Sequence, residues 1–178
     1  MSPSIWTPPS FVPLKHNFNG ASKGNLSPAG IDDVFRDTEG VMINIFSEFI
    51  STSTNNVAEL SALLMGLTIA HRQGWNSLTV EGDFLIIIYT TQRLLCGSGV
   101  QKLSENWRLD RLLENLLDLF LAFNILQTSH VRRKANKVAD YLKNQGASNL
   151  NSSVDSSWGS YTHQPNRNKL IQLEMKDM

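Results

Sequence analysis

Three carboxylates and one amide occupy positions where this chain could assemble a metal-dependent hydrolytic site, namely Asn19, Glu59, Asp83 and Asp140. Each falls at or near the end of an expected strand or helix, and carboxylates brought together repel one another unless a cation lies among them. Mg²⁺ suits such a group because it prefers carboxylate and water oxygens. Two such ions about 4 Å apart can activate a water and stabilise the leaving oxygen of a phosphodiester. By spacing alone the signal is weak, because each acid taken singly is also explained as a solvated surface group.

The elements that must position these residues begin with three strands. Leu14–Gly20 alternates apolar and polar residues and ends on Asn-Gly, which is typical of a strand that runs into a turn. Ala29–Arg36 and Val41–Phe49 are two further strand-like runs, and the turn at 37–40 between them ends on a glycine. Three consecutive strands with short connections predict an antiparallel meander.

A helix is predicted over Thr54–Trp75, because apolar residues recur there at intervals of three and four. Thr54 or Asn55 can cap its start, and Gly74 is placed to end it. Phe84–Leu95 is ambiguous: its Ile and Tyr content favours a strand, whereas its length and its neighbours favour a helix, which we prefer. The remaining predicted elements are a strand at Ser77–Glu81, a helix at Ser104–Phe120, a strand at Asn124–Val131 and a helix at Ala135–Gln145. The order β-β-β-α-β-α-α-β-α predicts an α/β fold, a mixed five-stranded sheet with helices on its faces.

The composition limits the classes of function. The 178 residues suit one domain, predicted at 14–147, with an extended lead-in at 1–13 and a disordered Ser- and Asn-rich tail at 148–178. The net charge is zero, so binding to nucleic acid requires a local patch. A single cysteine, Cys96, excludes an internal disulfide and fits a reducing compartment. The start does not resemble a secretory signal, and no apolar run is long enough to span a bilayer. We therefore expect a monomeric intracellular protein, cytoplasmic or nuclear and not secreted.

Five motifs occur in order around these elements: NFNGA at 17–21, AGIDDVFRDTEG at 29–40, TNNVAEL at 54–60, LTVEGD at 78–83 and HVRRKANKVAD at 130–140. With them the chain resembles the type 1 ribonuclease H family, and among its members the retroelement-derived ribonuclease H-like domains of plants. The resemblance covers roughly residues 14–147 and implies the ribonuclease H fold. It also implies an endonuclease that uses two Mg²⁺ (or Mn²⁺) ions to cut the RNA strand of an RNA/DNA hybrid.

The resemblance assigns roles to individual residues. The family's metal-binding acids fall on Asn19, Glu59, Asp83 and Asp140, and its mobile histidine, which helps product to leave, falls on His130. Glu59 alone could also be an acid that merely favours a helix N-terminus, and His130 could be a strand-end histidine bonded to backbone.

Substrate binding is assigned to two sets of residues. The family's substrate-contacting asparagines fall on Asn55 and Asn56, which would read RNA 2′-hydroxyls in the minor groove. A basic cluster follows the last strand, and it is either a solvated helix face or a patch that positions phosphates. Its members are Arg132, Arg133, Lys134, Lys137 and Lys143.

Two departures from the family pattern concern the candidate site. Asn19 stands where the family has its first metal-binding Asp, and an amide offers one oxygen without charge. Metal binding and cleavage should therefore be weakened, and the alternative is a non-catalytic relic of a retroelement enzyme that binds nucleic acid or protein. Asp32 and Asp33 replace a usual Gly pair beside Asn19. Because successive strand residues point to opposite faces, at most one of the two can approach the site.

Overall fold

The computed structural model describes residues 7–24, 26–96 and 107–132 of the chain. Within them the strands are β1 (Leu14–Ser22), β2 (Ser27–Asp37), β3 (Met42–Ser53), β4 (Ser77–Gly82) and β5 (Ile125–His130). The helices are α1 (Asn55–Arg72), α2 (Leu85–Leu95) and α3 (Trp107–Phe120). The predicted order is confirmed through β5, including the helix at the ambiguous run. The helix expected at Ala135–Gln145 lies outside the described residues.

The five strands form one mixed sheet in the order β3-β2-β1-β4-β5. β1 pairs antiparallel with β2 and parallel with β4, β2 pairs antiparallel with β3, and β4 pairs parallel with β5. The predicted meander is therefore β3-β2-β1. β1 is the central strand, so both of its faces can be covered. The carboxyl ends of β1, β3, β4 and β5 consequently meet at one edge of the sheet, which we call the carboxyl edge.

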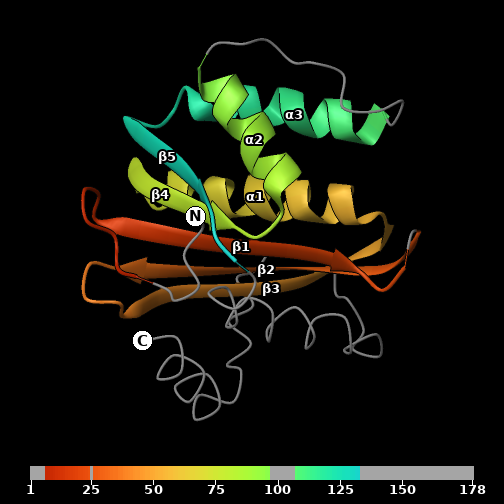
Figure 1. Cartoon of the computed structure of the whole chain (residues 1–178), viewed down its shortest axis with the longest axis horizontal. Helices are drawn as coiled ribbons and strands as arrows, with labels where there is room; N and C mark the ends of the chain where they lie inside the picture. The colour runs from red at the N-terminus through yellow and green to blue at the C-terminus, as the bar shows by residue number, and fades with distance from the viewer. Residues whose placement is uncertain (1–6, 25, 97–106, 133–178) are drawn as a thin grey trace.

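The described helices lie on one side of the sheet (Figure 1). α1 packs on β1 and β2, and α3 packs on α1. Phe18, Phe35, Leu60, Leu63 and Leu113 are fully buried between these layers. In the described part of the chain, no helix is both long enough and apolar enough to cross a membrane.

Helix α1 begins at the carboxyl edge, directly after β3. The hydroxyl of Thr54, the residue before the helix, accepts a hydrogen bond from the backbone N–H of Val57 at 3.3 Å. This contact satisfies one of the backbone donors that a helix start leaves without a partner. The cap thereby fixes the end of α1 that carries Asn55, Asn56 and Glu59.

Replacing Thr54 by Ala should lower the free energy of unfolding by about 1 kcal/mol, because the capping acceptor is lost. Urea unfolding of the full chain measures the change. Thr54→Ser keeps a hydroxyl and serves as the control. An Ala variant as stable as wild type, or a Ser variant as unstable as Ala, would contradict this role of the cap.

Candidate active site at the carboxyl edge of the sheet

Asn19 and Glu59 are brought together by a close approach of β1 to α1. Gly20 lies against the helix so tightly that a Cβ atom there would overlap the carbonyl of Ala58 and the backbone nitrogen of Glu59. Only glycine permits this spacing between strand and helix. Asn19 is 1% exposed and Glu59 is 5% exposed, so both side chains belong to the interior.

One hydrogen bond fixes the surroundings of this contact. The side-chain oxygen of Asn55 accepts from the backbone N–H of Ser22 at 2.7 Å, which ties the end of β1 to the start of α1. Glu59 is the fifth residue of α1, and the first turn holds no acid. The interpretation of Glu59 as an acid that merely favours the helix N-terminus is therefore wrong, because it is buried and lies beyond that turn.

Asp83 and His130 are the second pair at the carboxyl edge. Asn17 pairs with Glu81 across β1 and β4, so Asn19 and Asp83 each lie two residues further toward this edge. A ring nitrogen of His130, Nε2, lies 3.1 Å from the carbonyl oxygen of Asp83. This is the backbone contact expected of a strand-end histidine, and it also holds the imidazole beside Asp83.

Some of the other predicted site residues lie among the described residues, and the rest lie outside them. Asn55 is exposed, Asn56 is half-buried, and Arg132 is exposed immediately after β5. Asp140, Arg133, Lys134, Lys137 and Lys143 lie outside the described residues. Within residues 7–24, 26–96 and 107–132, no three His, Cys, Asp or Glu side chains form a group that could hold a metal ion. The described acids therefore form only part of the predicted ligand set.

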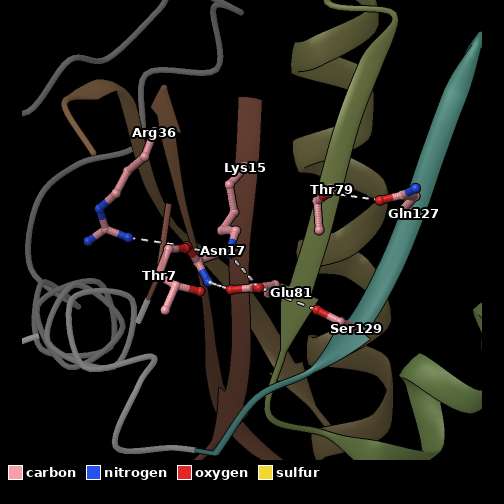
Figure 2. A network of polar contacts seen from close by, with 8 residues as sticks. All are labelled: Thr7, Lys15, Asn17, Arg36, Thr79, Glu81, Gln127 and Ser129. Carbon is pink, nitrogen blue, oxygen red and sulfur yellow. Dashed lines mark hydrogen bonds and ion pairs between the residues drawn. The ribbon is translucent and has the colours of Figure 1, made fainter. Parts of the chain in front are cut away.

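A buried polar network lies on the same face of β1 as Asn19, and the sequence did not predict it (Figure 2). Glu81 receives a hydrogen bond from the Asn17 amide at 3.1 Å and forms an ion pair with Lys15 at 2.7 Å. Arg36 on β2 donates to the Asn17 side-chain oxygen at 3.1 Å, and Ser129 on β5 donates to Glu81 at 3.3 Å. The network joins four strands directly behind the carboxyl edge, so it fixes β1 and β4 relative to each other where Asn19 and Asp83 follow.

The polar residues of the predicted strand at Leu14–Gly20 belong to this network. Lys15, Asn17 and Asn19 alternate with apolar residues, which is usual for a strand with one solvated face. Lys15 is nevertheless only 4% exposed and Asn17 only 1%. Polar residues on a central strand require buried hydrogen-bonding partners. Glu81, which follows Asn17 by 64 residues in the sequence, is that partner.

Comparison with known proteins agrees with this architecture. A family model described as reverse transcriptase-like matches residues 17–146. Ribonuclease HI of Halobacterium salinarum is 29% identical over 128 residues, which are 72% of this chain and 61% of that protein. The chain thus spans about three-fifths of the length of this curated relative.

Solved structures give the same result. Ribonuclease H1 from Halobacterium salinarum matches with a TM-score of 0.66 at 27% identity, covering 76% of this chain and 97% of that one. An N-terminal RNase H domain from Mycobacterium tuberculosis, solved as a fusion with maltose-binding protein, matches with a TM-score of 0.67 at 26% identity, covering 77% and 94%. LC11-RNase H1, solved in complex with RNA/DNA hybrid, matches with a TM-score of 0.66 at 26% identity, covering 76% and 96%.

The chain has a ribonuclease H-like fold, defined by the mixed sheet, its strand order and helix α1 packed on β1. Because the family model matches residues 17–146, the chain belongs to the reverse transcriptase-like family of these domains. The resemblance to ribonuclease H is thereby confirmed. The plant retroelement origin stays a prediction.

Proposed function

We propose that this domain hydrolyses the RNA strand of an RNA/DNA hybrid with the help of two Mg²⁺ or Mn²⁺ ions. The observation that carries the proposal is the placement of two pairs of residues at the carboxyl edge, Asn19 with Glu59 and Asp83 with His130. It is supported by LC11-RNase H1, a relative solved with such a hybrid.

The side chains at this edge fit hard divalent cations. Carboxylate and amide oxygens are the donors that Mg²⁺ accepts. The Asn19 amide nitrogen is buried and has no hydrogen-bond partner among the described residues. No hydrogen bond donated by this nitrogen to a described residue therefore fixes the orientation of the amide. Glu59 and Asp83, together with Asp140, would hold the ions. When bound, two such ions activate a water and stabilise the leaving oxygen of the phosphodiester.

The other residues bind and orient the substrate. Asn55 and Asn56 stand at the start of α1, where their amides can contact 2′-hydroxyls of the RNA strand. The Asn55 oxygen already accepts from Ser22, so its N–H₂ group is the part that can donate to substrate. His130 lies next to Asp83 and can exchange a proton with the departing product.

Cleavage by the purified full chain tests the proposal. A labelled RNA/DNA hybrid should be cut in Mg²⁺ or Mn²⁺, whereas double-stranded DNA should stay intact and EDTA should stop the reaction. The second candidate function is a non-catalytic relic that binds nucleic acid or protein, and Asn19 at the family's Asp position favours it. Binding of the hybrid without cleavage in either metal would establish the relic and exclude the enzyme.

Hybrid binding itself should be weak and sensitive to salt, because phosphate contacts release counterions. Arg132→Ala should weaken binding and lower the slope of log K against log salt by about 1. Fluorescence anisotropy at several salt concentrations measures the slope. Arg72→Ala is the matched control, since Arg72 is also exposed and lies at the opposite end of α1. An equal effect of the two variants would show only nonspecific attraction to a polyanion.

A further inference from the structure

A groove with a volume of about 250 Å³ lies between helix α3 and the junction of β3 with α1. Its lining includes Ser53, the last residue of β3, and three residues from the first half of α3, namely Trp107, Arg108 and Arg111. None of the described site residues at the carboxyl edge lines it. In the sheet, β2 also separates β3 from β1. The groove is therefore distinct from the candidate active site.

The lining of this groove is positively charged. Arg108 and Arg111 are three positions apart on α3, so they are neighbours on one face of the helix. Both are exposed, both line the groove, and none of the described residues that line it is an acid. A guanidinium group presents a planar fork of N–H donors that matches the oxygens of a phosphate. The charge of the groove therefore favours a ligand that carries phosphate.

Ser53 supplies a second, independent observation. It lines the same groove, it is only 2% exposed, and its hydroxyl has no hydrogen-bond partner among the described residues. Buried hydroxyls are nearly always hydrogen-bonded, because leaving one without a partner costs free energy. An oxygen of a phosphate bound beside the arginines would accept this hydrogen bond. Two exposed arginines alone are explained as a solvated helix face, but that explanation does not account for Ser53.

Trp107 gives the groove a flat aromatic surface. It is 68% exposed at the start of α3, directly before Arg108. Aromatic side chains of this kind stack on nucleobases without regard to sequence, because every base has a π-face. The volume of the groove is slightly below the roughly 300–1,000 Å³ of sites for drug-sized ligands. A single nucleotide therefore suits the groove better than a larger molecule.

We infer that this groove is a nucleotide-binding site. The phosphate lies among Arg108, Arg111 and Ser53, and the base stacks on Trp107. The nucleotide is either free or the phosphorylated end of a nucleic-acid strand, since the two present the same chemistry. The site is additional to the carboxyl edge and does not depend on hybrid cleavage.

Calorimetric titration of the full chain with adenosine 5′-monophosphate (AMP) tests this site. EDTA in the buffer prevents divalent cations from drawing phosphate to the carboxyl edge. Wild type should bind AMP, and Arg111→Gln should weaken the Kd by about tenfold or more, because a hydrogen bond to a charged group is lost. Arg72→Gln is the matched control, since Arg72 is an exposed arginine at the end of α1 and does not line the groove. Its Kd for AMP should equal that of wild type.

Two further variants separate the roles of the phosphate and the base. Ser53→Ala should weaken the Kd for AMP by about fivefold, the effect of one ordinary hydrogen bond. The melting temperature without ligand should not fall, because the hydroxyl has no partner among the described residues. Trp107→Ala should weaken binding of AMP but not of inorganic phosphate, which has no base to stack.

The source of the nucleotide is identified with a short oligothymidylate, with and without a 5′-phosphate. Tighter binding of the phosphorylated strand than of AMP identifies a strand end, and tighter binding of AMP identifies a free nucleotide. The site is overturned if wild type binds neither ligand, if Arg111→Gln binds AMP as tightly as wild type, or if Arg72→Gln loses as much affinity as Arg111→Gln. None of these results bears on hybrid cleavage, which is measured in Mg²⁺ or Mn²⁺ instead.

Discussion

Glu59→Gln is expected to slow cleavage of an RNA/DNA hybrid by at least about 10²–10³-fold, the usual cost of losing one well-placed electrostatic group. Glu59 is buried where α1 touches β1, and its carboxylate would face the bound metal ions. The Gln side chain has nearly the same shape, so packing is retained while the negative charge is lost. The effect should therefore fall on the rate of cleavage rather than on folding.

Single-turnover cleavage with excess protein isolates this effect, because it removes product release from the measured rate. Hybrid binding, followed by anisotropy without metal, should change little. Glu114→Gln is the matched control, since Glu114 is an exposed acid on α3 away from the carboxyl edge. A Glu59→Gln protein that cuts at the wild-type rate would remove Glu59 from the metal site.

The fold was predictable from the sequence because local periodicity and burial agree in most elements. Apolar residues in α1 recur at helical spacing and become its buried face. The ambiguous run at 84–95 was resolved correctly as a helix by its place after β4. Boundaries were less accurate: β3 runs on to Ser53, four residues beyond its predicted end. Pairing with β2 extends the strand there, and the local sequence does not show that pairing.

The candidate site was only partly predictable, because its supporting contacts join residues far apart in sequence. The motifs indicated Glu59 and Asp83, but nothing near Lys15 or Asn17 points to Glu81 as their shared partner. Strand alternation correctly separated Asp32 from Asp33. Which of them lies beside Asn19 required the register of β1 and β2.

His16 and Asp33 form a second feature that alternation could not reveal, a buried pair beneath helix α1. Both side chains are fully buried, and Nε2 of His16 lies 2.7 Å from Oδ1 of Asp33. The His16 ring also stacks on Phe35 with centroids 4.5 Å apart. Gly66 of α1 passes so close that a Cβ there would overlap the His16 ring. Helix and sheet therefore meet over a polar pair that has no access to solvent.

His16→Leu should lower the free energy of unfolding by about 3–5 kcal/mol at neutral pH, because it leaves the Asp33 carboxylate buried without its partner. The double variant His16→Leu with Asp33→Ala removes both polar groups and should recover most of that loss. Urea unfolding of the wild type, both single variants and the double variant gives the coupling energy between the two sites. Additive losses in the double variant would show that the pair contributes nothing as a unit.

The free energy of unfolding lost in His16→Leu should also depend on pH, and the burial of Asp33 determines whether the loss grows or shrinks on acidification. Burial raises the pKa of the Asp33 carboxyl above its usual 3.8, while the charge and hydrogen bond of His16 lower it. Removing His16 leaves only the raising effect, so the folded-state pKa of Asp33 in the variant lies further above the unfolded value. An acid whose pKa is higher in the folded state than in the unfolded state lowers the stability at pH values above the folded-state pKa. This loss of stability shrinks as the pH falls from the folded-state pKa toward the unfolded-state pKa. The deficit of His16→Leu relative to the double variant, which lacks Asp33, should therefore be largest near pH 7 and shrink steadily toward pH 4. Unfolding free energies measured across this range test the assignment, and a deficit that stays constant or grows on acidification would show that the lost stability is not a buried Asp33 charge.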